Sequence, residues 1–346
     1  MALLNELATC IQPHRIRKAA LIFNPNSGMR PQRRGRDLRL AERLFAEAGV
    51  ENFVVASESP ESAAEHAANA ARNGFDTVIA CGGDGTVHMV LQGILAAGVD
   101  VALGVIPLGC GNLLAKELHI PRETAASIHA LLEATAVRFP VPEIEYVGKD
   151  GESNRRYWGV AAGIGADAQV ICKIDPLQKS RFGIYAYYKE STRQLLLTRD
   201  PFTPFQLEFR ESESNTWRRE IVTQAVVARV TYFANALTNV QTGDGLSAPD
   251  LQLILFKTSS RWRYLQYGSK LVGRMLGGTP GTVPGVELVR ASEILCRPMP
   301  ASGNGHSAFA GKQVLAETDG ELLGTLPVRL WLGERTIRLV RPLGTA

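Results

Sequence analysis

Short apolar runs alternate with helix-like segments between residues 19 and 141, and this alternation limits the possible folds more than any other feature. Each run has the length and composition of a buried strand, and each is followed by a segment with helical periodicity. Strands that alternate with helices are joined by right-handed crossovers, which produce a parallel sheet covered on both faces. The expected strands are 19–23, 52–57, 76–81 and 101–106.

The helical segments between these runs carry recognisable signals. Leu38, Ala41 and Phe45 recur on one helical face. Ser59 and Pro60 supply an N-cap and a first-turn proline for an alanine-rich helix that reaches about residue 72. Three more helices are expected at about 86–97, 112–118 and 123–134.

The pattern changes after Pro142, where most segments alternate polar and apolar residues and are separated by Gly, Pro, Ser or Asp. Only two helices are expected there, at about 182–197 and 261–276. A chain of 346 residues exceeds one typical core, so two domains are expected. We predict an α/β domain with a parallel sheet over 15–142 and a mostly antiparallel β-sandwich over 143–334, with about 335–346 returning to the first domain.

Composition narrows the class of protein. Hydrophobic residues make up 45% and charged residues 21%, as in a folded protein with a polar surface. No apolar run reaches the ~18 residues of a transmembrane segment, and the N-terminus is not typical of a secretory signal. The five cysteines lie far apart and the histidines show no zinc-ligand spacing, which predicts reduced thiols and a cytoplasmic location.

Positive charge is concentrated in one short stretch. Between Arg15 and Arg39 the chain has eight Lys or Arg residues and one acid, Asp37. This balance suits an anionic partner, namely nucleic acid, a membrane surface or a phosphorylated ligand, although a solvated helix face explains it equally well. Because no aromatic residue lies between Met29 and Leu44, nucleic acid is not expected as a partner.

Three glycine- or asparagine-rich turns follow three of the expected strands. They are NPNSG after the first strand, GGDGT after 76–81 and PLGCGN after 101–106. Ligands of parallel sheets bind at the carboxyl ends of the strands, where glycines and helix N-termini favour a polyanion. Asp84, a carboxylate among these turns, is best explained as a partner of Mg²⁺ or as a base toward a hydroxyl.

Together these turns resemble the motifs of the diacylglycerol kinase catalytic domain family, which includes bacterial lipid kinases and sphingosine and ceramide kinases. The segments GVAAGIGADAQV, SRFGIYAYY, ETDGELLG and TIRLVRP extend the resemblance to nearly the whole chain from about residue 19. The GGDGT motif alone is shared with NAD kinases. The three turns combined with the late Asp319-Gly320-Glu321 are more specific.

The resemblance implies ATP-dependent phosphorylation of a lipid hydroxyl in a cleft between the domains, with ATP and Mg²⁺ as cofactors and a peripheral position at the inner membrane surface. Asp319 is the preferred base and Asp84 the competing one, while a simple hairpin turn is the structural alternative for the late motif. The implied catalytic residues are Asp319, Asp84 and Glu321, with Asp84 and Glu321 also as metal ligands. The implied nucleotide-binding residues are Asn24, Pro25, Ser27, Gly28, Ser57, Gly82, Gly83, Gly85, Thr86, Gly109, Gly111 and Asn112.

The chain departs from the family pattern at two positions. Met89 occupies a position where many members have Glu, and Leu113 replaces an Asp of the bacterial diacylglycerol-type members. These losses leave open a non-catalytic nucleotide- or lipid-binding protein, and the shared GGDGT motif leaves open an NAD kinase-like enzyme. A dinucleotide fold based on GIGADA is disfavoured, because that motif lacks a βαβ unit. Diacylglycerol, a sphingoid base, ceramide and a polyprenol all fit as the lipid.

Overall fold

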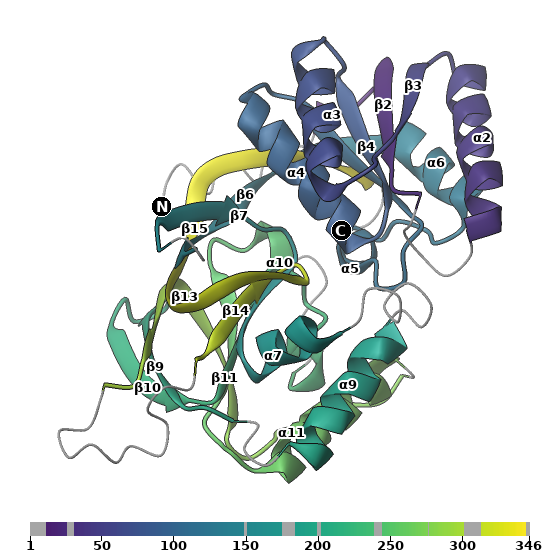
Figure 1. The fold of residues 1–346 in the computed structure, drawn as a ribbon. Coiled ribbons are helices and arrows are strands. Elements are labelled where there is room, and N and C mark those ends of the chain that lie inside the picture. The colour runs from purple at the N-terminus through teal and green to yellow at the C-terminus, as the bar shows by residue number, and fades with distance from the viewer. Residues whose placement is uncertain are drawn as a thin grey trace. The chain divides into compact units, whose positions relative to one another are not determined.

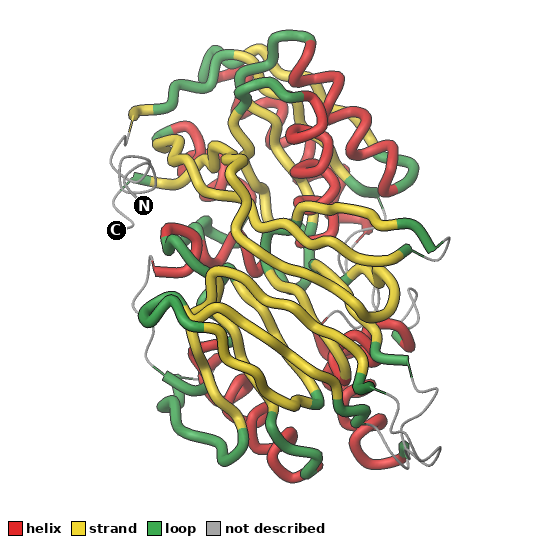
Figure 2. Tube along the Cα trace, turned by 90° about the vertical axis from the view of Figure 1, so that its left-hand side faces the viewer, coloured by secondary structure: helices red, strands yellow, loops and turns green. Residues whose placement is uncertain are grey.

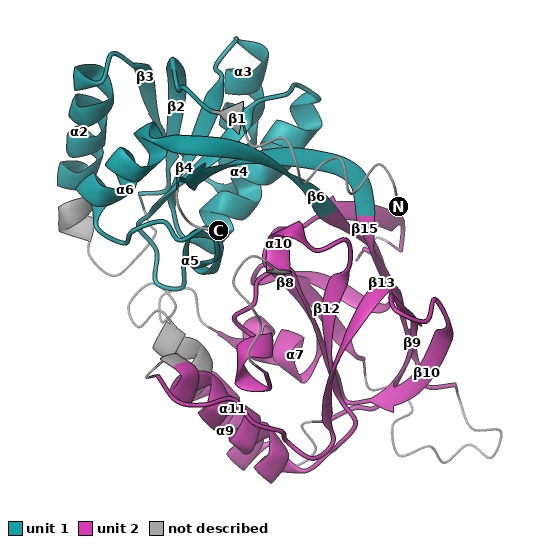
Figure 3. Cartoon of the chain, turned by 180° about the vertical axis from the view of Figure 1, so that it is seen from behind, with its two compact units in different colours: residues 1–141, 176–184, 333–346 teal, residues 142–175, 185–332 magenta. Residues whose placement is uncertain are grey.

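The structure is a computed structural model that describes residues 12–25, 31–148, 151–174, 184–198, 202–238, 244–275, 277–300 and 313–343. The chain divides into two compact units, shown in different colours in Figure 3. Unit 1 comprises 1–141, 176–184 and 333–346, and unit 2 comprises 142–175 and 185–332. Each unit is described by itself.

Unit 1 contains a parallel sheet. Its strands, in spatial order, are the C-terminal part of β15 (Glu321–Pro342), β5 (Ala102–Pro107), β4 (Thr77–Gly82), β2 (Lys18–Phe23) and β3 (Glu51–Ala56). Every pairing between these neighbours is parallel. The predicted parallel sheet is therefore confirmed, and the end of the chain supplies one of its strands.

Helices on both faces of this sheet bury its apolar residues (Figure 1). They are α2 (Pro31–Glu47), α3 (Pro60–Arg72), α4 (Asp84–Ala97), α5 (Leu113–Glu117) and α6 (Thr124–Leu132). On one face, Phe45 of α2 and Leu131 of α6 share a core with Ile79 of β4. The helices α3 and α4 also pack against each other. They approach so closely that a Cβ on Gly93 of α4 would lie 2.0 Å from the carbonyl oxygen of Ala64 in α3. The missing side chain of Gly93 in α4 therefore permits this packing.

The start of α3 follows the sequence prediction. Ser59 is the N-cap and accepts a hydrogen bond from the Ser62 N–H, while the Ser62 hydroxyl accepts one from the Ser59 N–H. This reciprocal pair satisfies two N–H groups that the helix itself leaves unpaired. Pro60 stands at the start of the helix, where its missing N–H costs nothing.

Unit 2 consists mainly of antiparallel strands, which lie side by side in Figure 2. β6 (Ala134–Val147) enters the unit and pairs with β7 (Ser153–Tyr157), and β1 (Gln12–Pro13) pairs with the start of β6 in unit 1. The other strands of unit 2 are β8 (Ala161–Gly165), β9 (Phe205–Glu211), β10 (Trp217–Val222), β11 (Gln224–Ala228), β12 (Leu251–Phe256), β13 (Val286–Pro298) and β14 (Leu315–Thr318), with the first part of β15.

The pairings of unit 2 form one sheet that closes on itself, whereas the sequence predicted a sandwich of two sheets. The circuit runs β13–β12–β11–β8–β14–β15 and returns to β13, where Ile294 pairs with Leu330. β13 and β15 are long enough for different stretches of each strand to pair with different partners. Polar–apolar alternation reports which face of a strand is buried but not which strand it pairs with, so this closure could not be predicted.

The described part of unit 2 also contains helices α7 (Ala166–Lys173), α9 (Ile184–Leu197), α10 (Asp244–Ser247) and α11 (Arg261–Met275), and a short 3-10 turn, η1 (Ala234–Ala236). The helices α9 and α11 match the two predicted ones. The sequence analysis missed α7, which directly follows β8 and has only eight residues, too few to show a helical period. None of the described helices combines the length and apolar character needed to span a bilayer.

Candidate functional site

Two of the glycine turns meet at one edge of the unit 1 sheet. β4 and β5 are paired in parallel register, and Gly82 at the end of β4 lies opposite Pro107 at the end of β5. The Gly82 carbonyl accepts hydrogen bonds from the N–H groups of Leu108 and Gly109, at 3.0 and 3.2 Å. The turns after the two strands therefore form one connected structure, as the sequence predicted from their position.

Glycine is required where the two turns touch. A Cβ on Gly109 would lie 2.3 Å from the Gly83 Cα, a distance that no side chain tolerates. Asn112 braces the second turn in a left-handed conformation, with φ at 49°. Its side chain accepts a hydrogen bond from the Gly109 N–H and donates one to the Gly109 carbonyl, at 3.0 and 2.8 Å. This contact brings two backbone segments together without any intervening side chain.

Asp84 lies beside this contact. It is the first residue of α4, after the N-cap Gly83. One carboxylate oxygen accepts a hydrogen bond from the Leu114 N–H at 3.3 Å, and the other would lie 2.8 Å from a Cβ on Gly111. The next residue, Gly85, is exposed and has open space around it. The carboxylate therefore lies among glycine backbone and at the N-terminus of a helix.

A basic residue that the sequence analysis did not select, Lys116, interacts electrostatically with Asp84. Lys116 belongs to the short helix α5, which directly follows the third glycine turn. Its side chain as a whole is exposed, yet partial removal of water from the ammonium lowers its pKa, an effect that Asp84 opposes and Arg122 reinforces. A lysine close to a turn of this kind could have been suspected, because cations accompany phosphate-binding loops.

The other nucleotide-binding residues expected from the sequence are placed as follows. Asn24 and Pro25 directly follow β2. Ser57 is buried after β3, and both its N–H and its hydroxyl donate to the Phe23 carbonyl at the end of β2. The buried Thr86 fills the space next to Gly82. Ser27 and Gly28 lie outside the described residues.

In unit 2, Asp319 forms part of a tight turn between β14 and β15. Asp319 and Gly320 both have positive φ, 51° and 83°, as a two-residue hairpin requires. The Asp319 carboxylate accepts three backbone hydrogen bonds, from Gly159, Val160 and Ala161, at 2.8, 2.8 and 3.0 Å. Its own N–H donates to the Ala161 carbonyl at 2.8 Å. The residue therefore holds the loop before β8 against the β14–β15 turn.

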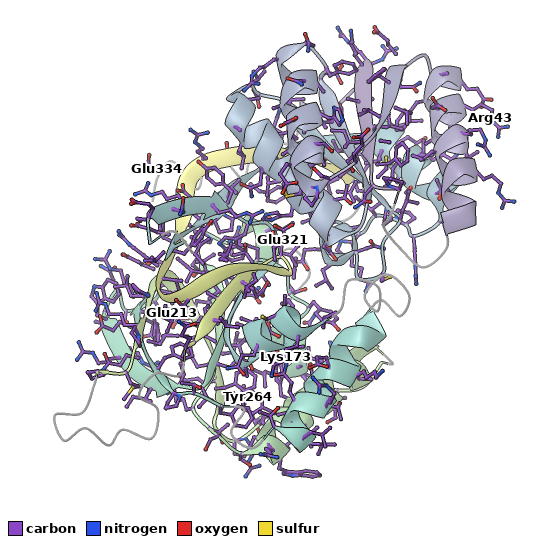
Figure 4. The ribbon with its side chains drawn as sticks, in the orientation of Figure 1. Arg43, Lys173, Glu213, Tyr264, Glu321 and Glu334 are labelled. Atoms are coloured by element: carbon purple, nitrogen blue, oxygen red, sulfur yellow. The ribbon has the colours of Figure 1, made fainter. Side chains whose placement is uncertain are left out.

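Glu321, the first residue of β15, forms an ion pair with Arg156 of β7 at 2.6 Å (Figure 4). Both side chains are partly buried. Glu321 thus contacts a cation of its own unit, and its expected role as a metal ligand stays a prediction.

Two further carboxyl groups of unit 2, Asp167 and Glu317, approach each other in the space that a side chain on Gly163 would fill. A Cβ on Gly163 would lie 2.5 Å from an Asp167 oxygen and 2.6 Å from a Glu317 oxygen. Burial raises the pKa of Asp167 to about 6. Burial and the neighbouring Asp167 raise the pKa of Glu317 well above its usual range, opposed by a hydrogen bond from the Gly320 N–H. Sequence reasoning missed this pair, because Asp167 and Glu317 are distant in the chain.

A buried arginine organises another loop of unit 2. The Arg229 guanidinium donates to the carbonyl oxygens of Leu246, Ala248 and Asp250, and the Arg229 N–H donates to Val160. The Asp250 carboxylate in turn pairs with Arg290 at 2.7 Å. Residues 246–250 are therefore held from within the unit by a guanidinium.

Among the described residues, no three His, Cys, Asp or Glu side chains gather into a metal-binding group. Mg²⁺ in nucleotide sites commonly takes one or two carboxylates and completes its shell with phosphate oxygens and water. Asp84 fits such a site, since its carboxylate lies beside backbone that glycines leave accessible. The residues of unit 1 thus suit a metal that arrives with a polyphosphate.

Comparison with known proteins shows what the region around this site is similar to. Residues 18–144 match the family model of the diacylglycerol kinase catalytic domain. The chain is 31% identical over 172 residues to a diacylglycerol kinase of Staphylococcus saprophyticus, which covers 50% of this chain and 53% of the relative. A diacylglycerol kinase of Staphylococcus aureus (strain bovine RF122) shows the same identity, with 51% of the relative covered. The chain therefore spans about half the length of the curated relatives it matches.

Solved structures show the same fold over nearly the full chain. A crystal structure of a protein from Bacillus anthracis str. Sterne has a TM-score of 0.69 and 18% identity, and covers 97% of this chain and 98% of that one. The crystal structure of a diacylglycerol kinase from the same organism has a TM-score of 0.63 and 16% identity, with 96% and 100% covered. These two likenesses concern the fold alone. Residues 18–144, which contain the glycine turns and Asp84, thus form the part of the chain that matches the diacylglycerol kinase catalytic domain.

Proposed function

We propose that this protein transfers the γ-phosphoryl group of ATP to a hydroxyl of a membrane lipid. The observation that carries the proposal is the contact between Gly83 and Gly109 beside Asp84, at the carboxyl edge of a parallel sheet. Backbone that closely approaches a ligand at a helix N-terminus favours phosphate groups. The match of residues 18–144 to the diacylglycerol kinase catalytic domain supports the same chemistry.

Unit 1 would hold the nucleotide. The Gly82–Gly85 and Gly109–Asn112 turns would receive the phosphates, and Asp84 would hold the Mg²⁺ that accompanies them. When bound, the metal neutralises charge that develops on the transferred phosphoryl group. Lys116 adds a positive charge that interacts with Asp84 and would contribute to the same phosphate site.

Unit 2 would supply the proton acceptor. We assign this role to Asp319. Three backbone N–H groups fix the direction of its carboxylate. The carboxylate would therefore meet a substrate hydroxyl without reorganisation. The ion pair with Arg156 would keep Glu321 in place beside it. The proposal requires Asp319 and Asp84 to face one cleft in the active protein.

A non-catalytic nucleotide-binding protein is the second candidate. Met89 is buried in α4, only 8% exposed, at a position where many family members have Glu. One carboxylate on the metal side is therefore absent, which favours binding without turnover over a fully equipped kinase.

The test is an assay with purified protein, ATP and Mg²⁺ across diacylglycerol, a sphingoid base, ceramide and a polyprenol, read by mass spectrometry of the lipid. NAD serves as a parallel acceptor. A phosphorylated lipid is the expected product. Phosphorylation of NAD alone would replace the proposal, and ATP binding by calorimetry without any product would support the non-catalytic protein.

A further inference from the structure

One end of the α9–α11 helix pair in unit 2 exposes three large apolar side chains. Leu196 and Leu197 at the end of α9 are 58% and 76% exposed, and Trp262 at the start of α11 is 70% exposed. The two helix ends are tied together, because the Arg261 guanidinium donates to the carbonyls of Leu196 and Thr198, at 3.3 and 2.7 Å. Figure 1 shows α9 and α11 next to each other. We call Leu196, Leu197 and Trp262 the apolar tip.

The helix α11, which carries Trp262 of the apolar tip, is packed firmly against the core of unit 2. Tyr264, labelled in Figure 4, stacks on Phe202 and Phe256 with ring centroids 4.2 and 4.7 Å away, and exchanges a hydrogen bond with Thr223 at 2.8 Å. The Tyr267 hydroxyl donates to the Phe233 carbonyl at 2.9 Å. The inner face of α11 thus packs in the core, while Trp262 faces solvent.

The two helices that carry the apolar tip are strongly positive. The helix α11 carries four cationic side chains, Arg261, Arg263, Lys270 and Arg274, and no acid. The helix α9 adds Lys189 and Arg193 against a single acid, Glu190, so the two helices hold six cations and one carboxylate. Glu190 is paired with Arg193 at 2.8 Å.

We infer that the apolar tip enters the interfacial region of an anionic phospholipid bilayer. Exposed Trp and Leu on a basic helical surface are the combination that interfacial membrane binding uses, with aromatic rings at the headgroup level and cations toward anionic lipid. The inference rests on the proposed function, because a kinase of membrane lipids must meet its substrate at the bilayer. It places this contact in unit 2, apart from the arginines of residues 30–39.

Tryptophan fluorescence gives a direct test. Vesicles of phosphatidylcholine and phosphatidylglycerol with brominated acyl chains quench a tryptophan that reaches the bilayer. The full-length protein and Trp217→Phe should both be quenched, whereas Trp262→Phe should lose most of the quenching. Trp217 is the matched control, since it is exposed on β10. Equal quenching of wild-type protein and Trp262→Phe would overturn the inference.

Partitioning gives a second measurement. Leu197→Ser and Trp262→Ser should each weaken binding to the anionic vesicles by roughly tenfold or more, as expected for one buried large apolar side chain. Ile221→Ser, which removes an exposed apolar side chain from β10, should leave binding unchanged. Equal binding of all three variants would also overturn the inference.

The two proposals fail separately. Quenching of Trp262 without phosphorylation of any lipid would retain the membrane contact and remove the kinase proposal. Lipid phosphorylation without quenching of Trp262 would retain the kinase proposal and remove the membrane contact. Turnover of a short-chain, water-dispersed diacylglycerol should be equal in wild-type protein and Trp262→Ser, because the apolar tip is assigned to the bilayer and not to the reaction.

Discussion

Asp84 of unit 1 and Asp319 of unit 2 both stand next to glycine in an Asp-Gly pair, but their surroundings differ. Asp84 begins a helix beside glycine backbone, accepts one long backbone hydrogen bond and interacts electrostatically with Lys116. Asp319 lies in a hairpin turn and accepts three short ones from the loop before β8. The comparison teaches that the same dipeptide can begin a helix beside glycine backbone or can form a hairpin turn whose carboxylate also holds a neighbouring loop.

The largest effect is expected for Asp319→Asn. An amide has only one acceptor oxygen, so at least one of the three N–H groups would face an NH₂ donor. The free energy of unfolding should fall by about 2–3 kcal/mol, measured by urea denaturation. Turnover should also fall at least ~100-fold at a temperature where the variant is folded, with nearly unchanged ATP affinity. Wild-type turnover in a folded variant would leave Asp319 with the structural role alone.

Asp84→Asn should separate activity from stability. Its amide oxygen can still accept from the Leu114 N–H, so the free energy of unfolding should change by less than about 1 kcal/mol. Calorimetry should show weaker Mg²⁺-ATP binding, and turnover should fall at least ~100-fold. A loss of stability as large as that of Asp319→Asn would contradict the comparison between the two carboxylates.

The glycine contact beside Asp84 can be tested in a matched pair of variants. Gly109→Ala would force its Cβ against the Gly83 backbone and should lower the free energy of unfolding by about 1–3 kcal/mol. Gly85→Ala has open space and should change it by less than about 0.5 kcal/mol. Thermal denaturation of both variants supplies the measurement. Similar melting temperatures would mean that the Gly83–Gly109 approach is not required by the fold.

The smallest effect concerns a third kind of carboxyl group, that of the half-buried Asp167. Its pKa is raised to about 6, so the folded state holds the proton more tightly than the unfolded chain does. Stability from this group is present below about pH 4 and is lost as pH rises through about 6. Between pH 4 and pH 7, the free energy of unfolding of Asp167→Asn should therefore rise by on the order of 1 kcal/mol relative to that of wild-type protein.

Urea denaturation across this pH range checks the sign, with Glu190→Gln as control. The Arg193 hydrogen bond lowers the pKa of Glu190, so that variant should lose its difference from wild-type protein only as pH falls. A constant difference between Asp167→Asn and wild-type protein at all pH values would refute the proton-holding role.

Much of unit 1 could be predicted because its signals are local. The apolar runs gave the four predicted strands, and Ser59 with Pro60 marked the start of α3. The position of the turns at strand ends placed Gly82 and Gly109 together, since neighbouring parallel strands end at one edge. Lys116 was not found, because nothing in the pattern of a five-residue helix shows that its ammonium lies near Asp84.

The sequence by itself determined the two-part organisation, the parallel sheet and the set of glycine turns, because periodicity and turn chemistry act over a few residues. Only the tertiary structure decided that the antiparallel strands close on themselves, that Asp319 holds the loop at 159–161, and that Asp167 and Glu317 meet beside Gly163. These contacts join residues that are far apart in the chain. Their geometry depends on strand register and packing, which no local pattern encodes.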